Sequence, residues 1–154
     1  MSDYILSEVW KNPTSMGGAW GGLNQPTAGA RFEQTLPKGD QPFQLYTLPT
    51  PNGIKATIML EELKELGVTQ AGYDAYRIKI GDGDQFGSDF VSINPNSKIP
   101  AMMDYSEDQP VRVFESANIL LYLAEKFGKL IPTDHAKRTE VSTGYFGKQV
   151  LLLF

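Results

Sequence analysis

The 154-residue sequence contains no cysteine and only one histidine, His135. Without cysteine, a disulfide scaffold, a thiolate metal site and a protein-borne thiol nucleophile are all excluded. A single histidine also excludes a histidine-based metal cluster and argues against a Ser-His-Asp triad, so we interpret His135 as a solvated linker residue. Any thiol chemistry must therefore come from a ligand, and we expect no metal.

Long apolar runs and clusters of positive charge are also missing. The longest apolar runs, 119–124 and 150–154, are far too short to cross a bilayer, and the N-terminus lacks the basic and apolar blocks of a signal peptide. Eighteen acidic residues against fourteen basic ones give a net charge of −4, and no basic cluster exceeds the pair Lys137–Arg138. We therefore expect a soluble, cytoplasmic protein with no nucleic-acid or membrane partner.

The first half of the chain predicts an arm followed by a strand, a helix and a strand. Residues 1–42 are rich in Gly, Pro, Asn and Thr without any period, which indicates an extended arm. Residues 43–48 alternate as a strand does, residues 52–66 have apolar side chains at helical spacing, and residues 73–78 form the next strand candidate. This order favours a parallel pair of strands.

The second half predicts a short amphipathic segment, a hairpin and a helix. The segment covers 86–93, and the hairpin joins strands 101–105 and 111–114 through a polar turn. The helix 115–127 is apolar nearly all round, so it should be buried on more than one side. The order βαβ and then ββα is typical of a thioredoxin-like α/β domain, here over residues 43–131.

Three short segments are candidates for a binding site at one end of this sheet. Pro100 immediately precedes a strand, where a cis bond would turn the backbone of Ile99 outward; the alternative is an ordinary strand-entry proline. Glu115–Ser116 opens one helix and Thr50–Asn52 opens the other, so each offers free N–H groups and a positive dipole end. The alternative for both is plain capping and turn formation.

These segments together resemble a known family. Residues 50–63, 81–86, 94–100 and 113–127 are similar, in order and spacing, to the N-terminal half of bacterial Nu-class glutathione S-transferases, of the glutathione-dependent disulfide-bond oxidoreductase type. The likeness covers roughly residues 10–140. It implies a thioredoxin-like N-terminal domain with an N-terminal arm, and a homodimeric family enzyme that holds up to two glutathione molecules per site and reduces disulfides.

The resemblance also implies which residues hold glutathione. Glu115 and Ser116 would bind the γ-glutamyl end, and the backbone of Ile99 before Pro100 would bind the cysteinyl part. The turn of Thr50, Pro51 and Asn52 replaces the catalytic Tyr, Ser or Cys of other classes, with Thr50 and Asn52 approaching the sulfur as catalytic residues. Gln85 and, from the arm, Asn24 match further glutathione-contacting positions; Lys98 neighbours the site without an assigned role.

The chemistry of a bound thiol agrees with this assignment. A thiol at a helix N-terminus meets unpaired N–H donors, and its pKa falls from about 8.5 into a range of about 3.5 to 7.5. The thiolate is the nucleophile of thiol–disulfide exchange. Glutathione is thus the expected co-substrate, with a disulfide as its partner; conjugation to an electrophile and an inactive glutathione-binding fragment are the alternatives.

Two other candidates are weaker. Asp82 and Asp84 hint at a calcium loop, but the twelfth position is Ile93 instead of Glu, so a simple turn is favoured. Tyr46 could activate a thiol as in tyrosine-type transferases, but it lies inside a strand, where sheet packing is favoured.

The end of the sequence departs from the family pattern. The family continues into an all-helical second domain, whereas residues 132–154 would provide only a linker and an aborted start of it. Residues 141–150 contain two glycines and predict a poor helix, so we expect 141–154 to be the product of a frameshift or truncation. Without the helical domain, the helix 115–127 and part of 52–66 should expose an apolar patch.

Overall fold

A four-stranded mixed sheet forms the centre of the computed structural model, which describes residues 29–150, with side chains to residue 146. The strands are β1 (Phe43–Thr47), β2 (Tyr73–Arg77), β3 (Ala101–Asp104) and β4 (Val111–Phe114), in the order β2-β1-β3-β4. β2 is parallel to β1, while β3 is antiparallel to both β1 and β4. The predicted parallel pair and hairpin are therefore confirmed.

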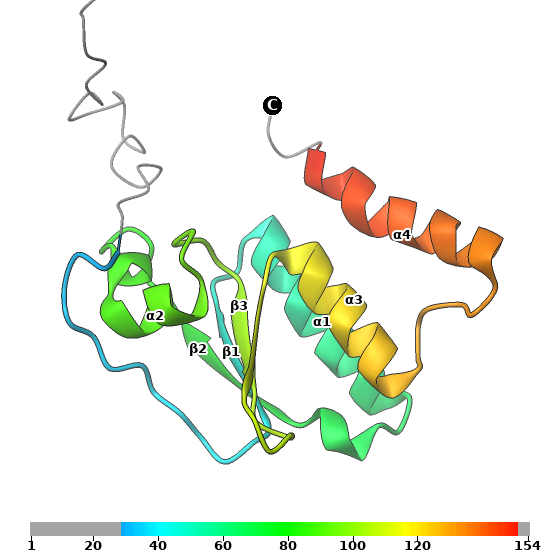
Figure 1. Ribbon diagram of the computed structural model, residues 1–154, viewed down its shortest axis with the longest axis horizontal. Helices are drawn as coiled ribbons and strands as arrows, with labels where there is room; N and C mark the ends of the chain where they lie inside the picture. The colour runs from blue at the N-terminus through cyan, green and yellow to red at the C-terminus, as the bar shows by residue number, and fades with distance from the viewer. Residues whose placement is uncertain (1–28, 151–154) are drawn as a thin grey trace, which may run out of the picture.

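Helices cover both faces of the sheet (Figure 1). α1 (Pro51–Glu65) and α3 (Ser116–Phe127) pack side by side on one face, and α2 (Ser88–Ile93) lies on the other. Two 3₁₀ turns, η2 (Thr69–Ala71) and η3 (Asp84–Phe86), connect the elements, and α4 (His135–Val150) lies beyond α3. The thioredoxin-like fold is present, with predicted boundaries that differ by one or two residues.

The alternation of β1 divides the core into two clusters. Phe43 and Leu45 point toward α1 and α3, where they pack with Leu60, Leu63 and other fully buried side chains. Tyr46 points to the opposite face and packs under α2, in a cluster with Ile78, Phe90, Ile93 and Ala101. Because β1 is buried on both faces, it is the central element against which the other parts of the domain are placed.

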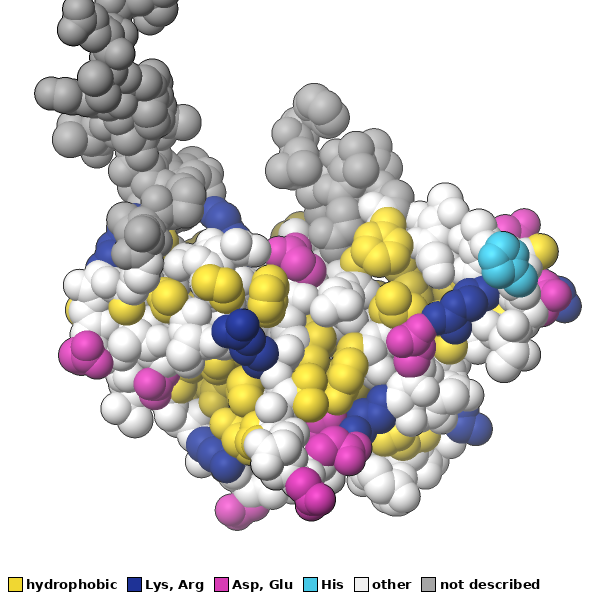
Figure 2. All heavy atoms as spheres, viewed as in Figure 1, with side chains coloured by type: hydrophobic (Ala, Val, Ile, Leu, Met, Phe, Trp, Pro, Cys, Tyr) yellow, Lys and Arg dark blue, Asp and Glu magenta, His cyan; other side chains and the backbone are white. Residues whose placement is uncertain are grey.

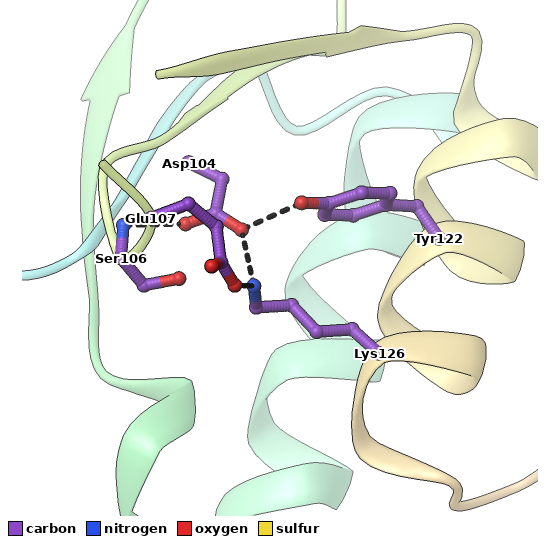
Figure 3. Close-up of polar contacts among 5 residues, drawn as sticks. All are labelled: Asp104, Ser106, Glu107, Tyr122 and Lys126. Carbon is purple, nitrogen blue, oxygen red and sulfur yellow. Dashed lines mark hydrogen bonds and ion pairs between the residues drawn. The ribbon is translucent and has the colours of Figure 1, made fainter. Parts of the chain in front are cut away.

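A buried ion pair joins the end of β3 to the end of α3 (Figure 3). The fully buried Asp104 accepts hydrogen bonds from the Tyr122 hydroxyl at 2.7 Å and from the Ser106 backbone N–H at 2.7 Å. Lys126 Nζ lies 3.1 Å from Asp104 Oδ2 and 2.5 Å from Glu107 Oε1. The cluster holds the C-terminal half of α3 on the sheet.

The expectation of a poor helix over residues 141–150 was wrong, because α4 runs without a break from His135 to Val150. Two glycines cost a helix about 1 kcal/mol each, but tertiary contacts offset this cost. The Tyr145 hydroxyl donates to the Leu130 carbonyl at 3.1 Å, and Arg138 pairs with Glu125 of α3. Propensity alone therefore gave the wrong answer for this segment.

Exposed apolar side chains were expected on α3 and part of α1, and only the expectation for α1 is confirmed. No large apolar side chain of α3 is exposed, because Leu120, Tyr122 and Phe127 pack against the core. Ile54 and Ile58 of α1 are 45% and 54% exposed, and Phe146 of α4 is 49% exposed. Charged side chains of both signs are interspersed on the face shown in Figure 2. No helix in the described part of the chain is long and apolar enough to cross a membrane.

Candidate functional site

The register of the sheet brings the candidate segments to one end of the domain. Tyr46 of β1 pairs with Ala101 of β3, and Ala101 pairs with Phe114 of β4. The residues just after β1, just before β3 and just after β4 therefore lie along one edge. These residues are the turn Thr50–Asn52, the Ile99–Pro100 bond and the pair Glu115–Ser116.

The turn after β1 is built as a helix start. Thr50 is the N-cap of α1, and its Oγ1 accepts the Gly53 N–H at 3.1 Å, while Pro51 occupies the first turn. A Cβ on Gly53 would overlap the carbonyl oxygen of Leu48, so this glycine allows the helix to begin directly above the strand. The Thr50 hydroxyl accepts this hydrogen bond and retains its own hydrogen for donation to a ligand.

Asn52 is the third member of the turn, and it is engaged differently from Thr50. Its Oδ1 accepts a hydrogen bond from Lys55 Nζ at 3.0 Å. This contact leaves the amide NH₂ of Asn52 as a donor group beside the first turn of α1. Both polar side chains of the turn can therefore donate a hydrogen bond to an anionic atom.

The bond between Ile99 and Pro100 is cis, which decides between the two alternatives that the sequence left open for this proline. The preceding loop is shaped by the buried Asn94, whose Nδ2 donates to the Lys98 carbonyl at 2.6 Å and whose Oδ1 accepts the Asn96 N–H at 3.0 Å. Within residues 29–146, no hydrogen bond occupies the backbone of Ile99. This backbone is available to an extended ligand, which would add to the sheet like a strand.

The start of α3 has an unusual backbone. Glu115 is the N-cap with φ 68° and ψ 120°, and its side chain makes no capping hydrogen bond. Such a conformation costs a non-glycine residue roughly 1–3 kcal/mol. Ser116, the first helical residue, is buried. A strained residue at a helix N-terminus, next to a buried hydroxyl, is typical of a site that binds an anionic group.

We expect the substitution Glu115→Gly to act in opposite directions on stability and binding. Glycine adopts a positive φ without strain, so the free energy of unfolding should rise by about 1 kcal/mol in urea denaturation. If glutathione binds here, as the resemblance implies, loss of the carboxylate should weaken that binding in calorimetric titration. Glu115→Gln retains the strained backbone and is the matched control. A fall in the stability of the glycine variant would contradict the claim that the backbone at Glu115 is strained.

Gln85 lies on η3, which follows β2 and leads into α2. Its side chain is buried, and its Oε1 has no hydrogen-bond partner among the described residues. A buried acceptor without a donor costs about 1–3 kcal/mol. Because β2 runs parallel to β1, the chain leaves both strands at the same end of the sheet before it reaches η3. The assignment of Gln85 to the glutathione site remains an expectation from the resemblance.

The remaining candidate residues from the sequence, Tyr46 and Asp84, have structural roles of their own. The Tyr46 hydroxyl donates to the Pro37 carbonyl at 2.9 Å, and burial first, with nearby Tyr105 and Tyr76, raises the pKa of Tyr46 to about 12. Tyr46 is therefore a packing residue, as favoured. Asp84 Oδ2 accepts the Lys79 N–H at 2.9 Å within the turn. Asn24 lies outside the described residues.

An apolar groove beside the Thr50 turn was missed by the sequence interpretation. It has a volume of about 490 Å³ and lies between α1, from Gly53 to Glu62, and the end of β2. Its surface is mainly apolar, with Leu48, Pro49, Ile54 and Ile58 in the lining. The sequence showed Ile54 and Ile58 only as apolar residues at helical spacing, which did not reveal that these two in particular would be exposed or that β2 would complete the groove.

A comparison with family models decides the identity of the domain. Residues 51–126 match the model of the glutathione S-transferase N-terminal domain. The chain contains a glutathione S-transferase N-terminal domain. The match begins at the first residue of α1 and ends in the last turn of α3, so it includes every candidate site residue except Asn24 and Thr50.

The similarity to known relatives reaches beyond the domain into the arm and α4. The disulfide-bond oxidoreductase YghU of Escherichia coli is 58% identical over 95% of this chain and 51% of its own length. The structure of glutathione transferase YghU from Streptococcus pneumoniae, complexed with glutathione, is 62% identical with a TM-score of 0.87, over 95% of this chain and 56% of that one.

A more distant structure extends the comparison. A glutathione transferase family member from Pseudomonas fluorescens, with two glutathione bound, is 45% identical with a TM-score of 0.58, over 64% of this chain and 41% of its own length. This chain spans about half the length of the relatives it matches.

Proposed function

We propose that this protein binds glutathione at the shared end of β1, β3 and β4 and uses its thiolate to reduce disulfides. The observation that carries the proposal is the convergence of two helix N-termini and the open Ile99 backbone on one edge of the sheet. The relatives support it, since one is a disulfide-bond oxidoreductase and others were crystallised with glutathione.

Each part of glutathione has a matching group in the site. The γ-glutamyl carboxylate suits the N–H groups and hydroxyl at Ser116, and the ammonium group suits the Glu115 carboxylate. The cysteinyl backbone pairs with the backbone of Ile99. The sulfur then approaches the first turn of α1, where Thr50 and Asn52 donate hydrogen bonds that favour the thiolate over the thiol.

The reaction is a pair of thiol–disulfide exchanges. The glutathione thiolate attacks one sulfur of the substrate disulfide, forms a mixed disulfide and releases the other sulfur as a thiolate that takes up a proton. A second glutathione thiolate attacks the glutathione sulfur of the mixed disulfide, releases the second substrate thiol and leaves glutathione disulfide. The protein binds and orients the two sulfur partners and stabilises the thiolate. None of these tasks requires a cysteine in the protein itself.

A second candidate function is the conjugation of glutathione to an electrophile. The apolar groove beside the Thr50 turn favours it, because such a groove suits an apolar carbon skeleton next to the sulfur. The two functions are separated by measuring the turnover of 2-hydroxyethyl disulfide and of a chloronitrobenzene in parallel assays and comparing the rates. Faster turnover of the disulfide supports the proposal, and faster turnover of the chloronitrobenzene supports conjugation.

Calorimetric titration with glutathione and with its disulfide tests the binding site directly. We expect Ser116→Ala to weaken binding about tenfold or more, because hydrogen bonds to charged groups contribute about 1.5–3 kcal/mol. Ser142→Ala, on α4, is the matched control and should bind as the unsubstituted chain does. Binding without turnover would indicate an inactive glutathione-binding protein, and an absence of binding would refute the site.

A further inference from the structure

The arm residues just before β1 hold the turn that carries Gln85. The Arg31 N–H donates to the Phe86 carbonyl at 2.8 Å, and the Arg31 guanidinium lies 3.4 Å above the Phe86 ring centroid. Gln34 Nε2 donates to the Asp84 carbonyl at 3.0 Å. The two carbonyl groups that flank Gln85 in sequence are therefore both bonded to the arm.

Gln34 makes the most extensive of these contacts. Besides its bond to Asp84, its Oε1 accepts the Phe90 N–H at 3.3 Å in the first turn of α2. Its backbone N–H donates to Ser88 Oγ at 2.9 Å, and the Ser88 hydroxyl lies 3.2 Å from its carbonyl oxygen. The N-cap of α2, Gly87, has no side chain to cap the helix, so Gln34 provides the missing cap from the arm.

Gly87 leaves the space in which the Gln34 side chain lies. A Cβ at position 87 would overlap Cβ, Cδ and Oε1 of Gln34. The backbone of Gly87, with φ −73°, is open to any residue, so it is the close approach of Gln34 that requires glycine here. Gln34 and Gly87 thus form a matched contact between segments 53 residues apart in sequence.

We propose that Gln34, seated over Gly87, is a positioning residue that fixes the carboxamide of Gln85, which the resemblance assigns to the glutathione site, so that the arm sets the affinity for glutathione. The unpartnered Oε1 of the buried Gln85 is the group whose place is fixed. A buried carboxamide contributes to binding only if the turn that carries it is held in one place. This inference rests on the proposed glutathione site and adds the arm as the element that controls it.

The test combines two ways of breaking the contact with a double-mutant cycle in the full 154-residue chain. Gln34→Ala removes the Gln34 side chain beyond Cβ. Gly87→Ala leaves Gln34 chemically unchanged but displaces its side chain from the space above position 87. We expect each variant to raise the Kd for glutathione about tenfold, within the range of interaction energies for residues in one hydrogen-bond network. In a Gln85→Ala background, Gln34→Ala should leave the Kd nearly unchanged, because its effect acts through Gln85.

Glu33→Ala is the matched control, since Glu33 is on the same arm segment, and within the described part of the chain its side chain accepts a hydrogen bond only from the Ser88 hydroxyl, at 3.1 Å. Its Kd should equal that of the unsubstituted chain. Amide hydrogen exchange gives a readout without ligand: Gln34→Ala should accelerate exchange at Phe86 and Gly87 and leave the β1 amides unchanged.

The outcomes separate the inference from the function on which it rests. If the unsubstituted chain does not bind glutathione, the proposed function fails, and exchange at Phe86 and Gly87 alone decides whether Gln34 holds the turn. If glutathione binds, an unchanged Kd in Gln34→Ala overturns the inference. So does an equally large loss in the Gln85→Ala background, because Gln34 would then act through general stability.

Discussion

Lys126→Met is expected to lower the free energy of unfolding by about 3 kcal/mol, since removal of one partner of a buried ion pair costs about 3–5 kcal/mol. Asp104 is fully buried, and Lys126 is its only cationic partner within the described residues. Without Lys126, the carboxylate retains only the hydrogen bonds from Tyr122 and Ser106 (Figure 3). Urea unfolding measures the difference.

The control is Lys64→Met, which removes the same kind of side chain from an exposed pair. Lys64 and Glu61 lie 3.2 Å apart with side chains 48% and 49% exposed. Such surface pairs contribute about 0–1 kcal/mol. Equal losses of stability in the two variants would show that the burial of Asp104 does not determine the cost.

The ion pair of Asp104 and Lys126 also determines the pH range in which Lys126→Met loses stability. Burial raises the pKa of Asp104, but hydrogen bonds from Ser106, Tyr122 and Lys126 outweigh it and hold the pKa below its usual value. Burial lowers the pKa of Lys126, but Glu107 and Asp104 outweigh it and raise the pKa. Stability from Asp104 is lost as pH falls through its lowered pKa, and stability from Lys126 is lost as pH rises through its raised one. The free energy of unfolding of Lys126→Met should therefore fall furthest below that of the unsubstituted chain between about pH 4 and pH 10.

Under the proposed function, Thr50→Ala is expected to lower disulfide turnover about hundredfold at neutral pH while changing the affinity for glutathione little. The reason is that removing one preorganised donor to a developing or bound anion costs about 10²–10³ in kcat. The Thr50 oxygen accepts the Gly53 N–H, and among the described residues its hydroxyl donates to no acceptor, so the hydroxyl hydrogen can point toward the sulfur. Ultraviolet absorbance of the thiolate should show a higher pKa for the bound thiol in the variant.

Thr50→Ser separates this role from helix capping. Serine keeps both the hydroxyl and the N-cap, so it should retain most of the turnover and of the stability. Thr50→Ala should also lose about 1 kcal/mol of stability as the cap is removed. A variant that loses stability but keeps its rate would show that Thr50 only begins the helix and that the thiolate is stabilised elsewhere.

Local patterns predicted most of the elements correctly because their signals lie within a few residues. Thr50 and Pro51 mark the start of α1, and Gly128, with φ 60°, marks the end of α3. The alternation at 43–48 identified β1, and the polar turn identified the hairpin of β3 and β4. The failure was α4, where the propensity of Gly144 and Gly147 was overridden by contacts with α3 and its loop.

The sequence by itself determined that any thiol must come from a ligand, because it lacks cysteine, and its motifs assigned the residues expected to bind glutathione. The sequence also predicted that three of these segments lie at one end of the sheet, and the strand register of the tertiary structure confirmed it, since the register joins residues far apart in sequence. Only the tertiary structure decided the strain at Glu115, the unpartnered oxygen of Gln85 and the contact of Gln34 with Gly87. Those features depend on packing between distant segments, which composition and local periodicity do not encode.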